Sequence, residues 1–358
     1  MALHFHKLTV KDVRKETADC VSVSFDISGE LKNDFIFTQG QNITIKSTID
    51  GEEIRRSYSI CTSPSDNELR VAVKKVSDGA FSIFANEKLK PGDVLDVMSP
   101  TGNFFTEVNA SNTKNYVFFA AGSGITPVIS IIKTILQVEP KSTVTLLYGN
   151  KNVSSIIFKE ALENLKDTYL QRLSIFYILS RERTDADINH GRIDVDKCQQ
   201  FSKLVDFLSV DEFFICGPEK MIFTVKEFLE EKGIERNKIH LELFTTPDRK
   251  IKKFINIKKA VEEEGSAITV KLDGRSFYFQ LDYDSNNILD EALAQGADLP
   301  FSCKGGVCTT CKAKIIEGNV EMEANYGLEP EEVEAGFILT CQSHPRSKKV
   351  VIDFDVKS

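Results

Sequence analysis

The rhythm of hydrophobic and polar positions changes twice along the chain. Up to about residue 108, short runs alternate apolar, mostly β-branched residues with polar ones, as in Cys20-Val-Ser-Val-Ser-Phe-Asp-Ile, and turn residues bound them. A period of two is typical of strands that bury one face. Apart from one short helix near 81–86, residues 1–110 are therefore expected to form an antiparallel β-barrel or sandwich.

From residue 111 to about 245, continuous apolar runs of strand length alternate with helical patterns. The runs lie at 115–121, 143–149, 172–179, 211–215 and 238–244, and helices are expected after Pro127 and near 155–169, 196–208 and 219–231. Strands buried on both faces and alternating with helices predict a doubly wound parallel α/β sheet. Thr126 suits the N-cap of the first helix and Pro127 its first position.

The last change follows residues 246–266, where a basic block and an acidic block with little periodicity predict a linker. Residues 267–358 then open with two strand patterns around Asp273-Gly274, a dipeptide typical of a tight hairpin. A short helix at 288–295 and a final strand at 350–354 complete a third, small domain.

Composition and charge narrow the function without naming it. The chain has 358 residues, 41% of them hydrophobic and 27% charged, which is ordinary for a globular protein. No apolar run approaches a membrane span, and a net charge of -8 argues against a nucleic-acid partner. Residues 267–358 hold 15 Asp or Glu against 9 Lys or Arg. That excess fits either steering towards a basic partner or a solvated surface.

The most specific chemistry lies in four cysteines of the third segment, Cys303, Cys308, Cys311 and Cys341. The spacing C-x4-C-x2-C with a distant fourth cysteine is the plant-type ligand pattern for a [2Fe-2S] cluster. Structural zinc is the weaker alternative, because such sites usually pair two C-x2-C knuckles. The first residues lack a signal-peptide pattern, so we expect a cytoplasmic protein with reduced thiols.

A cluster that carries single electrons requires a source of electrons, and a nicotinamide donor requires a flavin between the two. Arg56-Ser57-Tyr58-Ser59 places a cation and an aromatic ring on one strand face, which suits a pyrophosphate and a flat ring. Taken alone, the tetrapeptide is a weak signal, and a surface arginine beside a half-buried tyrosine is the better explanation of it.

A nucleotide site is indicated in the α/β segment. Gly122-Ser123-Gly124 forms a strand-to-helix turn that lets the backbone approach a phosphate, although the third glycine of the dinucleotide fingerprint is missing. Cys216-Gly217-Pro218 ends another parallel strand at the carboxyl edge, where open α/β sheets bind ligands.

Six motifs in order then resemble the ferredoxin-NADP reductase superfamily over residues 1 to about 245. They are Arg56-Ser-Tyr-Ser, Gly79-Ala-Phe-Ser, Gly122-Ser-Gly-Ile-Thr-Pro, Tyr148-Gly-Asn, Cys216-Gly-Pro and Glu242-Leu-Phe. Residues 267–358 resemble a plant-type ferredoxin of the β-grasp fold. The order of the parts is similar to reductase components of bacterial multicomponent oxygenases, in particular those of phenylacetyl-CoA epoxidases.

The resemblance implies site residues at matching positions. FAD would be held by Arg56, Ser57, Tyr58, Ser59, Val73, Lys74, Gly79, Phe81 and Ser82. The nicotinamide nucleotide would lie against Gly122, Ser123, Gly124, Thr126, Gly217 and Pro218, with Cys216 at its ring, while Glu242 and Phe244 would stand at the flavin. Ser59, Cys216 and Glu242 would position the reacting groups. Ser180-Arg181 would favour NADPH over NADH by meeting a 2'-phosphate.

These roles imply an NAD(P)H oxidoreductase in which electrons pass from NADPH through FAD and a [2Fe-2S] cluster to the oxygenase component of a monooxygenase. Two alternatives stay open. In the first, the acceptor is a Rieske-type dioxygenase, a desaturase-like enzyme or a cytochrome. In the second, the last domain is a redox-sensing docking module.

Overall fold

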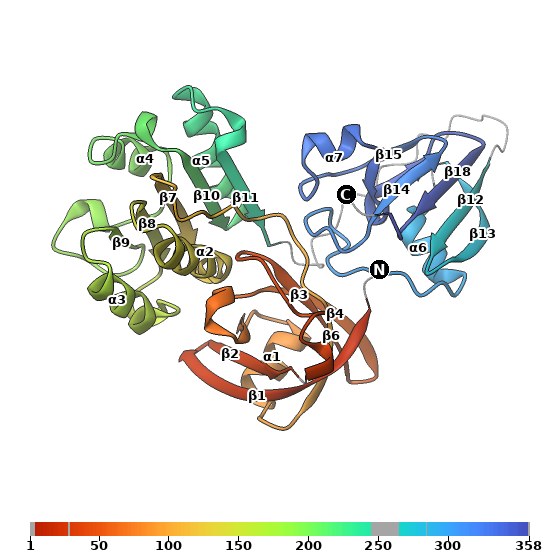
Figure 1. Cartoon of the computed structure of the whole chain (residues 1–358), viewed down its shortest axis with the longest axis horizontal. Helices are drawn as coiled ribbons and strands as arrows, with labels where there is room; N and C mark the ends of the chain where they lie inside the picture. The colour runs from red at the N-terminus through yellow and green to blue at the C-terminus, as the bar shows by residue number, and fades with distance from the viewer. Residues whose placement is uncertain (1–3, 28, 245–264, 284, 357–358) are drawn as a thin grey trace. The chain divides into compact units, whose positions relative to one another are not determined.

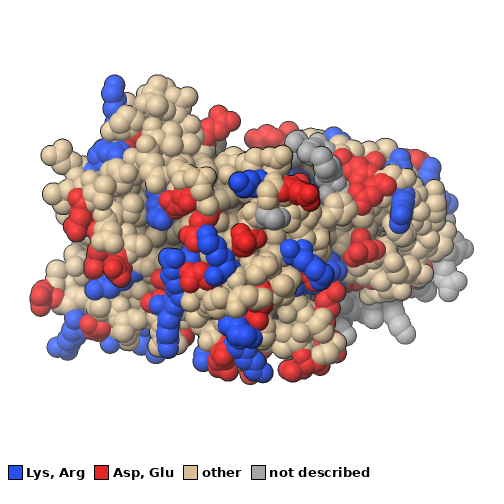
Figure 2. Space-filling view, turned by 60° about the horizontal axis from the view of Figure 1, so that its bottom comes forward, with Lys and Arg blue, Asp and Glu red and all other residues tan. Residues whose placement is uncertain are grey.

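The computed structural model describes residues 4–27, 29–244, 265–283 and 285–356 (Figure 1). Two compact units are distinguished by their internal contacts. One contains His6–Ile54 and Tyr58–Phe244; the other contains the described residues of Thr245–Ser358 with short pieces that include Arg55–Ser57. On the face shown in Figure 2, basic and acidic side chains are interspersed. No helix of the described ranges is both long and apolar enough to cross a membrane.

The first part of the chain is an antiparallel sheet of six strands in the order β4-β3-β6-β1-β2-β5. Its elements are β1 (Phe5–Thr17), β2 (Cys20–Asp26), β3 (Asn42–Ile49), β4 (Glu52–Ser59), β5 (Leu69–Lys74), α1 (Ala80–Glu87) and β6 (Val94–Met98). Ile60, directly after β4, bridges to Val71 of β5, so the two outer strands meet and close a barrel. The alternating apolar residues and Phe81 of α1 fill its core.

The second part is a parallel sheet in the order β11-β10-β7-β8-β9. It contains β7 (Asn115–Ala121), α2 (Ile125–Val138), β8 (Thr143–Asn150), α3 (Lys159–Thr168), β9 (Leu173–Leu179), α4 (Val195–Phe201), β10 (Glu212–Gly217), α5 (Glu219–Glu231) and β11 (Ile239–Leu243). Separate hydrophobic clusters cover its two faces, one with residues of α2 and α3 and the other with residues of α4 and α5. The predicted doubly wound fold is confirmed.

The strand order determines where a ligand can bind. β8 and β9 extend the sheet on one side of β7, whereas β10 and β11 extend it on the other. The connections therefore diverge at the carboxyl ends of β7 and β10, and open α/β sheets bind ligands in the crevice at such a switch point. Gly122 follows β7 and Pro218 follows β10 at this edge.

The third part has a mixed sheet in the order β13-β12-β18-β14-β16 and a small sheet of two strands. Its elements are β12 (Gly265–Leu272), β13 (Arg275–Asp282), α6 (Ile288–Ala294), β14 (Lys312–Glu317), β15 (Val320–Met322), α7 (Pro330–Glu334), β16 (Phe337–Leu339), β17 (Ser343–Pro345) and β18 (Lys349–Asp353). Asp273 and Gly274 both have positive φ, 51° and 69°. The predicted hairpin thus has the type I' turn that suits the twist of its strands.

Several local predictions differ from the structure. Thr126 is not the N-cap of α2, because a 3-10 turn over Gly122–Gly124 runs directly into the helix and Gly124 takes that position. The helix expected at 196–208 ends at Phe201, and a separate 3-10 turn covers Phe207–Ser209. The predicted linker overlaps β12 at its last two residues; its remainder, 246–264, lies outside the described residues.

Candidate functional site

The end of β4 carries the residues expected at the flavin. The ring of Tyr58 packs against that of Phe81 with centroids 5.5 Å apart, so α1 fixes its orientation from within the barrel. Ser59 is 3% exposed, and its hydroxyl has no hydrogen-bond partner among the described residues. Buried hydroxyls nearly always have a partner. A bound group that supplies one, as a flavin edge would, fits this position.

The turn before α1 is shaped for close backbone approach. The hydroxyl of Ser82 donates to Gly79 O (2.9 Å) and accepts from Val76 N (3.2 Å), which closes the turn. A Cβ built on Gly79 would lie 2.5 Å from that hydroxyl oxygen and 2.5 Å from Val76 Cγ2, so a larger residue would displace these side chains. The turn leaves helix N-H groups of α1 as donors, and such groups suit the pyrophosphate expected here.

Two further residues expected at the flavin stand on β5 and differ in exposure. The side chain of Val73 is fully buried in the barrel core and therefore does not reach the surface. Its carbonyl accepts a hydrogen bond from the side chain of Asn86. Lys74, at the end of the strand, is partly exposed, and its Nζ lies 3.6 Å from a Cβ built on Gly122. The lysine thus brings a positive charge from the barrel to the first glycine of the nucleotide turn.

The glycines after β7 permit unusually close packing at the switch point. Gly122 has a φ of 55°, and its carbonyl accepts a hydrogen bond from the buried Tyr148 hydroxyl at 3.0 Å. A Cβ on Gly124 would lie 2.1 Å from the carbonyl oxygen of Cys216. Thr126, inside α2, donates to Ser123 O at 3.0 Å. The turn at Gly122–Gly124 and the segment that begins at Cys216 therefore form one surface of backbone atoms.

Cys216 lies beside Ala120 of β7 and Glu242 of β11 in the parallel register. It is fully buried, and burial, helped by the charge of Glu242, raises the pKa of its thiol well above the usual value. The thiol therefore stays neutral and is suited to packing, not to nucleophilic attack. Phe244 follows β11 with 42% of its surface exposed, and this leaves one ring available to a ligand.

The expected ribose-phosphate residues follow β9. Ser180 N donates to Asn150 O (2.9 Å) and Arg181 N donates to Lys151 O (2.8 Å), so the loop continues the pairing of β8 with β9 beyond the strand ends. Ser180 Oγ also donates to Asn150 O. Arg181 is exposed, which leaves its side chain available at the carboxyl edge of the sheet.

The four predicted ligand cysteines are brought together as two pairs. The Cys303 and Cys308 thiols hydrogen-bond each other, and so do those of Cys311 and Cys341. The bond from Cys308, against the effect of burial, lowers the pKa of Cys303 to about 6. Gly305 N and Cys308 N donate to Cys303 Sγ at 3.3 and 3.4 Å. Backbone donors around an acidic thiol suit a ligand that binds as thiolate.

The pairing distinguishes between the metals considered. In the described part of the chain, no three His, Cys, Asp or Glu side chains converge as they would around a single ion. A structural zinc ion needs four ligands around one centre, whereas a two-iron cluster is held by two cysteines on each iron. The donor set of two thiol pairs fits the [2Fe-2S] cluster that the cysteine spacing predicts.

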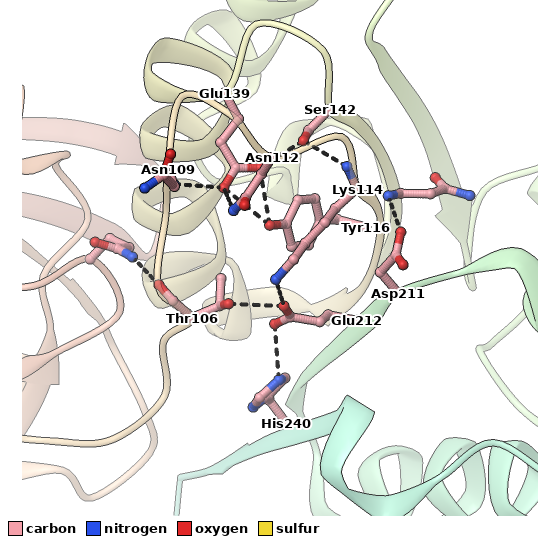
Figure 3. A network of polar contacts seen from close by, with 12 residues as sticks. Thr106, Asn109, Asn112, Lys114, Tyr116, Glu139, Ser142, Asp211, Glu212 and His240 are labelled. Atoms are coloured by element: carbon pink, nitrogen blue, oxygen red, sulfur yellow. Dashed lines mark hydrogen bonds and ion pairs between the residues drawn. The ribbon is translucent and has the colours of Figure 1, made fainter.

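A buried polar network at the opposite edge of the parallel sheet was not expected from the sequence (Figure 3). Glu212, at the start of β10, accepts hydrogen bonds from Lys114 and Thr106 and pairs with His240 Nε2 at 3.2 Å. Burial alone would raise the pKa of Glu212, but His240, Lys114 and Thr106 together lower it to about 2. Gln39 of the barrel donates to Thr106 O at 2.6 Å, so the network also joins barrel and sheet.

Comparison with protein families divides the chain in the same order as its fold. A model of the oxidoreductase FAD-binding domain matches residues 7–106, one of the oxidoreductase NAD-binding domain matches 118–227, and one of the 2Fe-2S iron-sulfur cluster binding domain matches 270–346.

Similar proteins combine the same three parts. A component protein of 1,2-phenylacetyl-CoA epoxidase from Escherichia coli is 46% identical over 99% of this chain and 98% of its own. The ferredoxin reductase component of 3-ketosteroid-9-alpha-monooxygenase from Rhodococcus rhodochrous is 32% identical over 97% of this chain and 96% of its own. The crystal structure of phthalate dioxygenase reductase covers 98% of both chains at 22% identity with a TM-score of 0.56, which supports the fold.

Proposed function

We propose that this chain, which belongs to the family of oxygenase reductase components that join FAD-binding, NAD-binding and 2Fe-2S domains, delivers electrons to the oxygenase component of a phenylacetyl-CoA epoxidase. The observation that carries the proposal is the similarity to the Escherichia coli epoxidase component, which extends over essentially the full length of both chains.

The chain is an NAD(P)H oxidoreductase. When bound, FAD accepts a hydride from the nicotinamide nucleotide and the [2Fe-2S] cluster passes the electrons on singly. The protein's own contribution is positioning. We assign the flavin to Arg56, Ser57, Tyr58 and Ser59 with the Gly79 turn, and the nicotinamide to the wall formed by Cys216, with Glu242 beside it.

Cys216 is fully buried between β7 and β11 and its thiol is neutral, so it would support the surface on which the ring packs without offering a competing base. The hydroxyl of Ser59, which lacks a partner among the described residues, would hydrogen-bond the flavin. The cluster ligands are Cys303, Cys308, Cys311 and Cys341, and their two pairs support this assignment.

NADPH is the proposed donor, with NADH less favoured. Arg181 offers a guanidinium to a 2'-phosphate at the sheet edge where the adenosine ribose is expected, and guanidinium binds phosphate in bidentate fashion. The proposed place of the reaction is the cytoplasm, where thiols stay reduced. All eight cysteines are free, in keeping with such a compartment.

Reconstitution tests the acceptor. The purified chain is mixed with the oxygenase subunits of a phenylacetyl-CoA epoxidase, NADPH and phenylacetyl-CoA, and substrate loss is followed by chromatography. We expect NADPH-dependent turnover. The parallel mixture contains the oxygenase component of 3-ketosteroid-9-alpha-monooxygenase and its steroid. Turnover there, with none in the epoxidase mixture, would contradict the proposed acceptor while leaving the reductase chemistry intact.

A further inference from the structure

Gln342, the residue after the fourth cluster cysteine, has a buried carboxamide. The residue is 3% exposed. Its Nε2 lies 3.0 Å from Lys304 O, 2.9 Å from Cys341 O and 3.7 Å from Cys341 Sγ. One side chain therefore reaches the loop that carries three cysteines and the distant segment that carries the fourth.

The contact with Lys304 falls where the loop is most constrained. Lys304 has a φ of 50°, a left-handed conformation that non-glycine residues adopt at a cost of roughly 1–3 kcal/mol. Its Nζ pairs with Asp290 of α6 at 2.6 Å and lies 4.6 Å from the centroid of the Phe301 ring. The side chain of Lys304 is thus held by α6, and its carbonyl is held by Gln342. Together they fix the turn directly after Cys303.

The stem of Gln342 adds a steric contact to the hydrogen bonds. Gly306 has a φ of 74°, and a Cβ built there would lie 3.1 Å from Gln342 Cγ and 2.8 Å from Ala324 O. The loop between the first two cysteines is therefore pressed against Gln342 on one side and against the segment at Ala324 on the other. Only glycine allows this approach.

The amide has two hydrogens for three acceptors. Both carbonyl oxygens are within normal hydrogen-bond distance, and the sulfur lies at the longer distance typical of a weak acceptor. A cysteine sulfur bound to iron is a thiolate and accepts more strongly than a thiol. Hydrogen bonds to cluster sulfurs change the reduction potential, because a donor stabilises the form that carries the additional electron.

We infer that Gln342 is a positioning residue for the cluster, which ties the Cys303–Lys304 turn to Cys341 and, by donating towards the Cys341 sulfur, raises the reduction potential. The inference requires only the cluster and is independent of the proposed acceptor. A merely space-filling side chain would affect retention of the cluster but would leave its potential unchanged.

The test replaces Gln342 with Met, which keeps length and volume and removes both donors. The full chain is purified with its cluster, and the potential is measured by redox titration followed by electron paramagnetic resonance. The rate of cluster loss to an iron chelator is measured in parallel. Gln295→Met is the matched control, because that glutamine is exposed in the same domain and its side chain donates to Glu291 of its own helix region.

We expect Gln342→Met to shift the potential to more negative values and to lose its cluster severalfold faster, whereas the control behaves as wild type. Gln342→Leu, which has neither an N-H donor nor a charge, should shift the potential in the same direction and serves if the methionine variant does not fold or does not retain its cluster. A wild-type potential in either cluster-bound variant would overturn the inference.

Discussion

At the scale of single residues, the same chemical group has different roles because its surroundings differ. Cys303 has a lowered pKa because a second thiol and two backbone N-H groups donate to it. Cys216 and Cys198 have raised pKa values because burial disfavours the thiolate. The chain thus contains one thiol suited to bind iron, that of Cys303, and two thiols suited to a packed interior, those of Cys216 and Cys198. Substitution of single cysteines tests these different roles.

Cys216→Ala should slow reduction of the bound flavin by NADPH between about 10-fold and 100-fold, the cost of misplacing a reacting group by an ångström or so. FAD content should be unchanged, because the cysteine belongs to the nucleotide sheet and not to the barrel. Stopped-flow absorbance measures the rate. Cys198→Ala, also fully buried but in α4, is the matched control. Equal rates in the two variants would refute the role of Cys216.

Arg181→Ala should lower kcat/KM for NADPH by about 10-fold, since a charge-assisted hydrogen bond to phosphate contributes roughly 1.5–3 kcal/mol before solvent screening. The value for NADH, which lacks the 2'-phosphate, should barely change. Steady-state rates with both nucleotides decide the matter. Arg236→Ala, an exposed arginine paired with Glu230, controls for the loss of one positive charge. An unchanged ratio of the two values would contradict the NADPH assignment.

At the scale of elements, backbone approach and a buried carboxylate hold β7, β10 and β11 in place. At the carboxyl edge, Gly124 packs on the carbonyl of Cys216. At the amino edge, Glu212 of β10 pairs with His240 of β11 (Figure 3), and the ring of His240 stacks on Phe214 with centroids 4.5 Å apart. The two ends together fix the strand that presents Cys216.

Gly124→Ala should lower the free energy of unfolding by about 1–3 kcal/mol, the usual cost of forcing an extra methyl into a packed site, and should weaken nucleotide binding. The physical reason is the built Cβ, which meets a carbonyl oxygen that cannot rotate away. Urea unfolding and the KM for NADPH measure the two effects. Gly29→Ala, where the built Cβ has nothing within 4 Å, should be nearly neutral.

Glu212→Gln tests the network at the other edge. The pKa of Glu212 is lowered to about 2, so its ionised form stabilises the fold at pH values above the unfolded value of 4.5. That contribution, at most about 3 kcal/mol, is lost as the pH falls from about 4.5 towards 2. The variant should be less stable than wild type at neutral pH, and the difference should shrink in acid.

Chemical denaturation at a series of pH values measures this difference. Glu231→Gln, at the exposed end of α5, supplies the control for the charge change. A difference from wild type that does not depend on pH would show that the carboxylate is not held in its ionised form.

At the scale of the whole molecule, Cys311 and Cys341 belong to a hydrophobic core that contains no residue of the barrel or the parallel sheet. One cluster of buried residues lies within the barrel, and two cover the faces of the parallel sheet, one of them together with Cys20, Cys61 and Ala72 of the barrel. The residues from Ile268 to Ile352 form another. A defect at the cysteine loop should therefore remain within its own core.

Cys308→Ser should abolish the absorbance and paramagnetic signal of the cluster. Ferricyanide can take electrons directly from the flavin, so its reduction by NADPH should persist near the wild-type rate. Electron delivery to the oxygenase should be lost. Thr309, which is partly exposed in the same loop, offers the control Thr309→Ala, which removes no ligand. Loss of ferricyanide reduction in Cys308→Ser would contradict the independence of the two parts.

The sequence by itself determined the class of each part and indicated the proposed cluster ligands. Alternation with a period of two and continuous apolar runs are local properties, so β2 and the strands β7 to β11 were predictable from them. Four cysteines at a specific spacing indicate their metal before any fold is known. The Asp273-Gly274 hairpin followed from the preference of that dipeptide for positive φ.

Only the tertiary structure decided the features that depend on residues distant in sequence. The pairing of Glu212 with His240, the approach of Gly124 to Cys216, and the reach of Gln342 to Lys304 join segments that no local pattern relates. The physical reason is that a hydrogen bond or a steric limit acts through space, whereas periodicity acts along the chain. The start of α2 shows the same limit, because packing at the sheet edge extended the turn at Gly122–Gly124 into the helix.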